Sequence, residues 1–401
     1  MKVTTKKYST ILSVLVFGII MGVVAKTNAS ANSQLNLSEK QMLMLSTYAY
    51  EINADNLRSV EENLDSMKTN GSFDATKVKS VESGVKPSEF IKVFKDMDKD
   101  DIISDLVVVD SIDGYIRAMC LVPSNQVDKK NAEAVIVFLG TKGNNEAWLD
   151  NFEGAYNEDT ELQLVAGRFF DKVSKKYKVT NVTGHSKGGN LTQYIAITRG
   201  DNIRKAVSFD GQGFSDLFFN KYKAKIEQNG SKLTTIASYK DPVHVLMDKL
   251  PVNEKIIKTD EEINTMLSHL PNTLYEPEYF DANGSYKTAY LTEESEMVDA
   301  IEDLSKYIID NCSDELLKAG CEKTTPIISY CFALGQRILE REDVSIVKAA
   351  YQEFIKFNNK SAENYTLTDI EKNVTTPQNE VNNDSAAVNE TTSVQSQNQD
   401  Y

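Results

Sequence analysis

Residues 179–190 read VTNVTGHSKGGN, and this stretch decides the fold. Its first half is rich in β-branched residues, which favour a strand. Gly184 and Gly188 flank Ser186, and they suit a tight turn because a side chain at either position would collide with neighbouring backbone. Apolar residues then recur at helical spacing, at Leu191, Tyr194, Ile195 and Ile197. The stretch predicts a strand, a sharp turn that carries Ser186, and a helix.

The pattern G-x-S-x-G in this setting indicates a nucleophile elbow. Such a turn holds its serine on a strained corner, which presents the hydroxyl at the sheet edge above a helix N-terminus. The five-residue pattern is weak by itself, and the strand before it and the helix after it make it informative. We therefore interpret Ser186 as the nucleophile of a serine hydrolase.

Strand-like and helix-like runs alternate along the chain on both sides of the elbow. The apolar run 134–139 is typical of a strand buried on both faces. This alternation predicts an α/β fold with a mostly parallel sheet flanked by helices. We expect strands at 102–110, 115–122, 134–139, 205–209 and 233–239, and helices at 37–50 and 162–177.

The chain divides into four regions by composition. Three lysines precede an uncharged run at 11–25, and Ala-Ser-Ala follows at 29–31, so residues 1–31 are expected to be a signal peptide cleaved near Ala31 in a secreted protein. Residues 32–290 form the expected α/β domain. Helical spacing predicts a C-terminal helical region at 291–362. The polar remainder, 363–401, is expected to be a disordered tail.

Charge and cysteine content narrow the function further. The formal net charge of −15 argues against nucleic-acid binding. Cys120 lies in an apolar run and is expected to be a buried thiol, whereas Cys312, Cys321 and Cys331 leave a disulfide open. The sequence contains no C-x-x-C, no H-x-x-x-H and no cluster of histidine and cysteine, so neither a metal nor a cofactor is expected.

A serine nucleophile needs a base, and the chain has three histidines. His185 adjoins the serine and is expected to pack and orient the turn. His269 follows the last strand by a long excursion, as the order serine, acid, histidine requires. His269 is therefore the favoured base, with His244 as the alternative.

Two aspartates end strands at the sheet edge where such sites form. Asp210 follows the first strand after the elbow unit, and Asp241 follows the second. The acid most often follows the later strand, which favours Asp241. Asp210 is retained as the alternative, and its other interpretation is a turn-forming aspartate before glycine.

The oxyanion of an acyl-transfer reaction needs two donors. One is expected to be the backbone N–H of Lys187, directly after the serine. The other is expected from the turn Gly140-Thr141-Lys142-Gly143, which ends a buried strand, with Thr141 as the candidate. The other interpretation of that segment is a simple β-turn.

These motifs carry a family resemblance, which covers about residues 37–290. The run Gly184-His-Ser-Lys-Gly-Gly-Asn190-Leu, with Phe138-Leu-Gly-Thr141 before it and Trp148-Leu-Asp-Asn151 between them, resembles the class 3 (fungal-type) lipases and, more closely, a bacterial lipase-like branch of the α/β-hydrolases. The resemblance implies Ser186, Asp241 and His269 as the triad, with Thr141 and Lys187 at the oxyanion hole. Class 3 lipases usually have leucine where this chain has Lys187, which leaves room for a polar or anionic ester.

The expected function is that of a secreted lipase-like or esterase-like serine hydrolase that acts on a small-molecule or lipid ester, with transient contact to a lipid interface. Two alternatives stay open. The first is an exported binding or surface protein on a hydrolase fold. The second is peptidase or thioesterase chemistry at the same site, since all of these are acyl transfers. An aromatic stripe at 214–222 is expected to form an acyl-binding wall, a flap or the inner face of a covering helix.

Overall fold

A seven-stranded sheet forms the centre of the molecule in the computed structural model, which describes residues 34–50, 58–71, 87–114, 116–141, 150–311 and 344–359. The strands lie in sequence order. The first three pair antiparallel, and from β3 onward the sheet is parallel. Their bounds are β1 Leu106–Asp113, β2 Arg117–Pro123, β3 Glu133–Phe138, β4 Lys178–His185, β5 Lys205–Phe209, β6 Leu233–Ser238 and β7 Asn253–Ile257.

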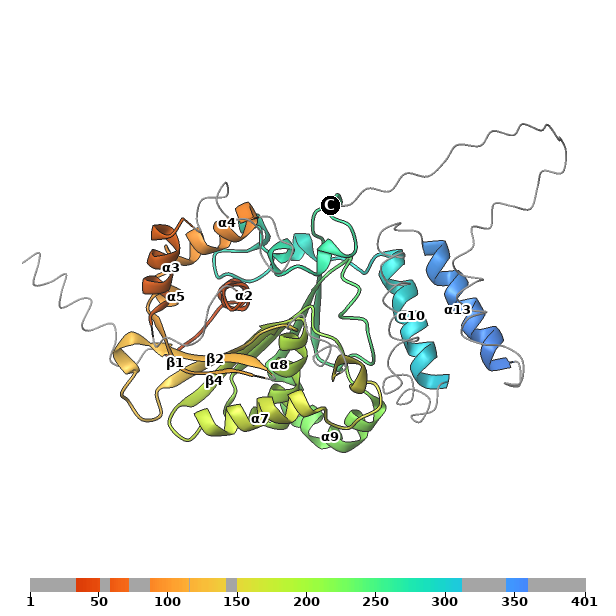
Figure 1. Ribbon diagram of the computed structural model, residues 1–401, viewed down its shortest axis with the longest axis horizontal. Helices are drawn as coiled ribbons and strands as arrows, with labels where there is room; N and C mark the ends of the chain where they lie inside the picture. Colours follow the sequence, from red (N-terminus) through yellow and green to blue (C-terminus); the bar gives the residue numbers. More distant parts are fainter. Residues whose placement is uncertain are drawn as a thin grey trace, which may run out of the picture.

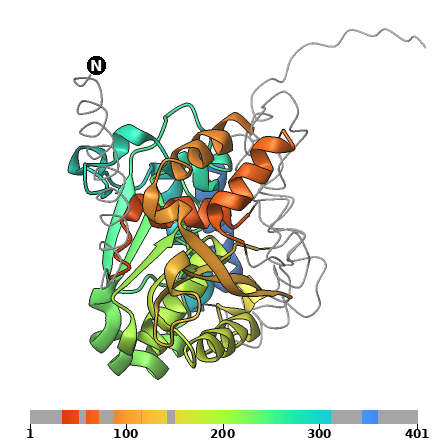
Figure 2. The same ribbon diagram turned by 90° about the vertical axis from the view of Figure 1, so that its left-hand side faces the viewer.

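Helices cover both faces of the sheet (Figure 1). One layer holds α2 (Glu39–Tyr48), α3 (Val60–Thr69), α4 (Pro87–Met97) and the one-turn α5 (Asp101–Ser104). The other holds α7 (Glu161–Val173), α8 (Lys187–Thr198) and α9 (Asp216–Asn229). Figure 2 shows the same two layers from the side, with the strands between them.

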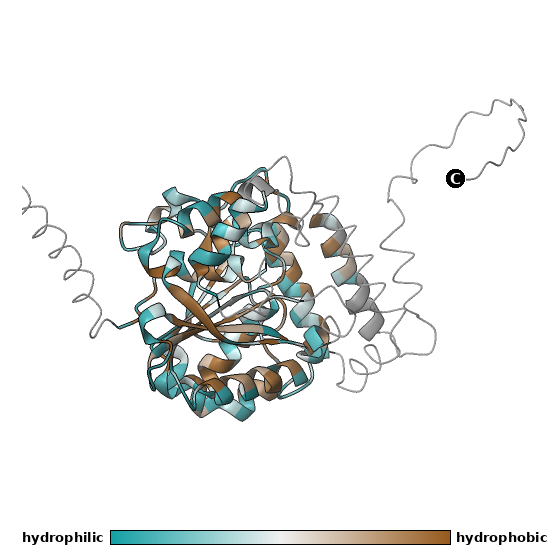
Figure 3. Cartoon of the chain, turned by 60° about the vertical axis from the view of Figure 1, so that its left-hand side comes forward, coloured by the Kyte–Doolittle hydropathy of each residue, from teal (hydrophilic) through white to brown (hydrophobic). Residues whose placement is uncertain are grey.

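Alternation along the strands divides the core into two halves. On β2, Met119 and Leu121 join the apolar cluster under α2, whereas Ala118, Cys120 and Val122 join the cluster under α7 and α8. Figure 3 shows hydrophobic residues on the strands and on the sheet-facing sides of the helices. Cys120 is fully buried and free, as expected. The sheet, its two helical layers and the turn between β4 and α8 confirm the α/β-hydrolase fold.

Two further helices, α10 (Glu296–Asn311) and α13 (Val344–Asn359), lie side by side next to these layers (Figure 1). An ion pair between Lys348 and Glu296 and a ring contact between Tyr307 and Tyr351 join them. Both helices fall in the expected C-terminal helical region. The signal peptide, the tail, Trp148 and the three other cysteines lie outside the described residues. Within the described residues, no helix is both long and apolar enough to cross a membrane.

The structure corrects three details of the expected elements. The run at 102–110 begins as α5 and not as a strand, because the Asp100 side chain accepts the backbone N–H groups of Ile102 and Ile103 and caps a helical turn. The sequence did not predict the helix α3, which a capping box at Ser59 starts. The edge strand β7 was not predicted, because its sequence, NEKII, is short and lacks a clear period.

Candidate active site

The turn after β4 has the geometry of a nucleophile elbow. Ser186 has φ 59° and ψ −125°, a strained conformation for a residue with a side chain. A Cβ on Gly184 would clash with the backbone of Gly188, and one on Gly188 would clash with the backbone of Phe138. The two glycines therefore let the turn pass close to β3, and α8 begins immediately after the serine.

Three side chains that are far apart in the sequence meet at this turn. His269 Nε2 lies 2.9 Å from Ser186 Oγ, and His269 Nδ1 lies 2.6 Å from Asp241 Oδ1. Asp241 is fully buried, whereas the His269 side chain is 21% exposed and Ser186 is half-buried. The favoured nucleophile, base and acid are thus hydrogen-bonded in that order, with the hydroxyl at the more accessible end.

Opposing effects set the charge of Asp241. Burial by itself would raise the pKa of this carboxyl group. The charge of His269 and the hydrogen bonds from His244 and His269 outweigh burial and hold the pKa of Asp241 below its ordinary value. The carboxylate therefore stays ionised and orients the Nδ1–H of His269.

His185 packs against the turn, as expected. Its ring nitrogens lie 2.8 Å from the carbonyl oxygen of His269 and 2.8 Å from the hydroxyl of Tyr50. Because a carbonyl can only accept, Nε2 carries the proton and Nδ1 accepts from the tyrosine. Burial, with the nearby charge of His269, lowers the pKa of His185 to about 3, so this ring is neutral.

Tyr50 was not identified from the sequence. It follows the last turn of α2, and its hydroxyl approaches Gly140 so closely that a Cβ there would overlap it. The backbone of Gly140 hydrogen-bonds to the same hydroxyl. Tyr50 therefore connects the turn after β3 to His185 and, through that ring, to the loop that carries His269. No local pattern around residue 50 signals this contact.

The two alternatives from the sequence occupy other positions. His244 lies against the second oxygen of Asp241, to which its Nδ1 donates at 2.9 Å, and it does not contact Ser186 in this arrangement. Asp210 is fully buried with φ 46°. Its Oδ1 accepts from Ser238 N, and its Oδ2 lies 3.4 Å from His185 Nε2. Burial, followed by the charge of Asp241, raises the pKa of Asp210 well above its usual range.

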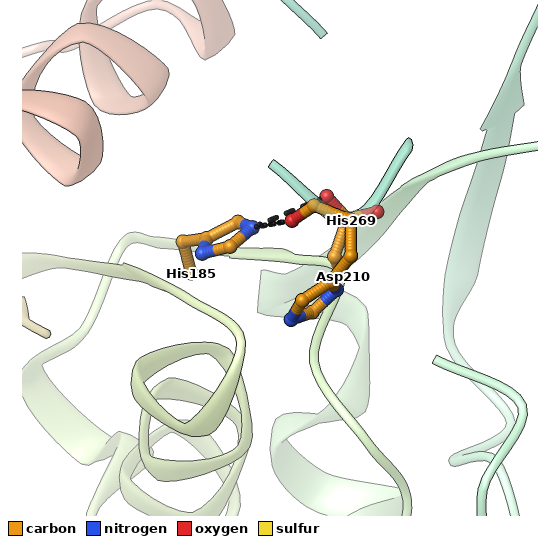
Figure 4. A group of neighbouring side chains, drawn as sticks. All are labelled: His185, Asp210 and His269. Carbon is orange, nitrogen blue, oxygen red and sulfur yellow. Dashed lines mark hydrogen bonds and ion pairs between the residues drawn. The ribbon is translucent and has the colours of Figure 1, made fainter. Parts of the chain in front are cut away.

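Figure 4 shows His185, Asp210 and His269, whose ligand atoms lie within 4.8 Å of one another. Such a group of ligand types could hold a metal ion. Both ring nitrogens of His269 are engaged, however, one with Ser186 and the other with Asp241, and His185 uses both of its own. The donor set therefore fits a hydrogen-bonded cluster better than a metal centre.

The two predicted oxyanion residues lie on either side of the elbow. Thr141 is half-buried after β3, and the side chain of Asn151 donates to its hydroxyl at 3.2 Å. Lys187 is the first residue of α8, where backbone N–H groups have no partner within the helix. Residues 142–149 lie outside the described residues.

The side chain of Lys187 was expected to place a positive charge near the substrate, but the structure pairs this charge inside the protein. It is buried, 3% exposed, and its ammonium lies 2.5 Å from the carboxylate of Asp150. The charge is therefore compensated inside the protein. The Lys187 charge therefore gives no support to a polar or anionic ester as substrate. That substrate was suggested by the presence of lysine where class 3 lipases usually have leucine.

The aromatic stripe at 214–222 is the inner face of a covering helix. Phe214 and Phe218 are almost fully buried and stack at 4.0 Å between ring centroids. Tyr194 of α8 packs on Phe218 and on Tyr222. These contacts hold α9 against α8, so these rings belong to the core.

Comparisons with known proteins give one family match and several distant structural similarities. A family model described as Mbeg1-like matches residues 117–310, just under half of the chain. No curated protein matches the sequence. Similar solved structures include the Lip2 lipase from Yarrowia lipolytica, at 13% identity over 55% of this chain and 77% of that chain, with a TM-score of 0.32.

The M37 lipase is 12% identical over 60% of this chain and 90% of its own, with a TM-score of 0.32. The extracellular lipase LipA from Serratia marcescens is 16% identical over 58% of this chain, with a TM-score of 0.30, and the match spans only 49% of LipA. Likeness this distant carries no argument about substrate. The chain is similar to the Mbeg1-like family over residues 117–310, on an α/β-hydrolase fold.

Proposed function

We propose that this protein is a serine hydrolase of the lipase or esterase type, which cleaves carboxylic esters through Ser186, His269 and Asp241. One observation carries the proposal. The hydroxyl of a strained elbow serine is hydrogen-bonded to an imidazole, which is in turn held by a buried, ionised carboxylate. A serine hydroxyl becomes a useful nucleophile when a base so oriented can take its proton.

In the proposed mechanism, Ser186 Oγ attacks the ester carbonyl as His269 Nε2 takes its proton. The resulting oxyanion accepts hydrogen bonds from the backbone N–H of Lys187 and from Thr141. His269 then gives its proton to the leaving alcohol, and an acyl-enzyme remains. Water, deprotonated by His269, attacks the acyl-enzyme; the bond to Ser186 Oγ then breaks, His269 returns the proton to Oγ, and the acid is released. Asp241 keeps Nδ1–H of the base in place and stabilises the imidazolium that forms twice in each cycle.

The substrate is proposed to be a small-molecule or lipid ester. The charge-compensated Lys187 leaves no free cation from that residue to select an anionic substrate. Export through a signal peptide at residues 1–31 is part of the proposal, and it predicts that protein recovered outside the cell begins near Asn32. The division into an α/β domain at 32–290 and a helical region at 291–362 also stays a prediction.

A fluorescent fluorophosphonate tests the chemistry directly, because it labels only an activated serine. We expect the full-length protein to be labelled, labelling to be lost in Ser186→Ala, and the labelling rate to fall at least about 1,000-fold in His269→Ala. Ser174→Ala removes an exposed serine at the end of α7 and is the matched control. It should label like the wild type.

The alternatives make different predictions in this experiment. A wild-type protein that stays unlabelled, with and without detergent micelles, would support the non-catalytic binding protein and refute the hydrolase. If labelling depends on Ser186, parallel assays with esters of increasing acyl length, a thioester and a peptide identify the acyl-transfer class. Turnover of the peptide alone would replace the esterase assignment by that of a peptidase.

A further inference from the structure

His244 contacts the proposed triad from the side opposite the base. Its backbone N–H and its ring Nδ1 both donate to Asp241 Oδ2, at 2.7 and 2.9 Å. His269 occupies the other oxygen, Oδ1. The carboxylate is thus held at both oxygens, and it cannot rotate without breaking the contacts of one histidine or the other.

The far side of the His244 ring faces a second carboxylate. Its Nε2 lies 3.5 Å from Glu294 Oε1, and the ring is 4% exposed. Glu294 is itself held by Lys249, whose ammonium lies 2.8 Å from the same oxygen. An imidazole enclosed between two carboxylates is stabilised in its charged form, because each of its N–H groups then faces a negative charge.

Other charged groups around His244 either stabilise its charged form as well or compensate each other's charge. Asp210 adds an attraction, and Lys249 and Glu254 line a small cavity beside the ring. Burial opposes the charge. The hydrogen bond with Asp241 and the nearby carboxylate of Glu294 outweigh burial and raise the pKa of His244 to about 10. His244 is therefore an imidazolium at neutral pH.

Glu294 belongs to the segment that leads into α10, and this segment is fastened to the strand end that precedes Asp241. Ser295 N donates to Tyr239 O at 2.9 Å. Farther along α10, the hydroxyl of Ser305 accepts from Met247 N at 3.2 Å. The start and the middle of α10 therefore hold both ends of the loop that carries Asp241 and His244.

We propose that His244 is a positioning residue that fixes the Asp241 carboxylate and, through Glu294, makes the alignment of the base depend on helix α10. The inference rests on the proposed function of the triad. It gives the segment that starts α10 a role at the active site, because Glu294 stabilises the positive charge of His244 next to Asp241. A cation at this position also disfavours a second positive charge on His269, so it tunes the base as well as aligning its partner.

The groups that face His269 are Asp241, the neutral His185 and, through Asp241, the charged His244. Replacing His244 by asparagine keeps a donor at the place of Nδ1 and removes the charge. We expect the pKa that governs the acid limb of kcat/KM to rise by about one pH unit, the size expected for one nearby charge at an effective dielectric constant of about 20. A merely structural residue would lower kcat without moving the limb.

The three histidines allow a measurement that needs no substrate. Nitrogen-15 NMR of the imidazoles in the full-length protein should give three titrations. One ring should stay charged beyond pH 9, as expected for His244, and another should stay neutral to below pH 4, as expected for His185. In His244→Asn the charged ring should disappear from the spectrum.

Glu294→Gln is the second variant, and Glu302→Gln is its matched control. Glu302 pairs with Lys249 at 3.5 Å from within α10, and the structure records no contact between it and His244. Glu294→Gln should lower the pKa of His244 by at least about one unit, and Glu302→Gln should leave it unchanged. The inference is wrong if the ring of His244 is neutral at pH 7, or if both glutamine variants act alike. A wild-type protein that fluorophosphonate does not label would refute the proposed hydrolase activity. The histidine titrations would still show whether His244 is charged and whether Glu294 causes that charge.

Discussion

The polar side chains beneath Ser186 form one buried cluster, and their charges follow from their contacts. Asp241 and His244 are charged and His185 is neutral at pH 7, whereas burial and then the charge of Asp241 raise the pKa of Asp210 well above its usual range. Neighbouring carboxylates cannot both be ionised at low cost in the interior. The carboxylate that is paired with histidines, Asp241, keeps its charge, and Asp210 binds its proton more tightly than a free aspartate does.

Asp210→Asn tests this assignment, because asparagine has the shape of the protonated acid. The raised pKa of Asp210 means that its contribution to stability is present below the pKa of the unfolded chain and is lost as pH rises. Relative to the wild type, the variant should gain stability between pH 4 and pH 8, by the order of 1 kcal/mol or more. Urea denaturation at both pH values measures the difference.

Asp128→Asn, an exposed aspartate, is the control and should show no such gain. A variant whose stability relative to the wild type is the same at pH 4 and pH 8 would mean that Asp210 is already ionised in the folded protein.

At the residue scale, sequence reasoning could select Ser186, Asp241 and His269, because the elbow pattern and the order of strand ends leave few candidates. The structure brings these three together, and their catalytic role stays a prediction until labelling is measured. It could not find Tyr50, which reaches His185 across 135 positions. Sequence reasoning also could not decide whether His244 is the base or a residue that contacts Asp241, since this depends on the path of the loop after β6.

Among the elements, the start of α7 and the start of α8 share one carboxylate. Asp150 accepts from Thr160 Oγ1 at 2.8 Å and from Leu162 N at 3.0 Å, at the N-terminus of α7. It also pairs with Lys187. One buried aspartate thus caps a helix and neutralises the cation beside the elbow serine.

Asp150→Asn should therefore destabilise the protein by about 3–5 kcal/mol, because it leaves the Lys187 ammonium buried without a counter-charge. Lys187→Met should cost a similar amount by itself. The double variant should recover part of the loss, which thermal denaturation of all four proteins measures as a coupling energy. Strictly additive losses would show that the two side chains do not interact.

The element scale also shows where pattern reasoning works. The helix expected at 37–50 from its apolar spacing is α2, which a capping box between Ser38 and Gln41 starts. The buried strands β3 to β6 were found from their apolar runs. Two of the failures, α5 and β7, are segments of four and five residues, too short for either period to be distinguished. The ten-residue α3 was missed for another reason, because it buries only Val60 and Leu64 and so has little apolar periodicity.

Over the whole molecule, α2 is held to parts of the chain far beyond it. Glu39 is 5% exposed; its carboxylate lies 2.6 Å from Lys255 of β7 and accepts from Tyr286 N at 2.9 Å. Ser46 contacts Thr183 of the elbow strand. The N-terminal helix is thus part of the core on which the site rests, and the match of the family model begins only after it.

Glu39→Gln should lower the free energy of unfolding by about 2–4 kcal/mol, since it leaves the buried part of Lys255 without its counter-charge. Glu61→Gln, an exposed glutamate in the first turn of α3, is the control and should change it by less than about 0.5 kcal/mol. Denaturant titration measures both. Equal effects would show that α2 is held by its apolar face alone.

Every pairing in the sheet joins strands that are consecutive along the chain. A chain leaving the ribosome can therefore add each strand to an edge that is already formed. His269 is made 83 residues after Ser186, which is about 4–17 seconds of synthesis at ordinary rates. During that interval the proposed nucleophile lacks its proposed base, so the nascent chain cannot assemble the triad until about two thirds of it has been made.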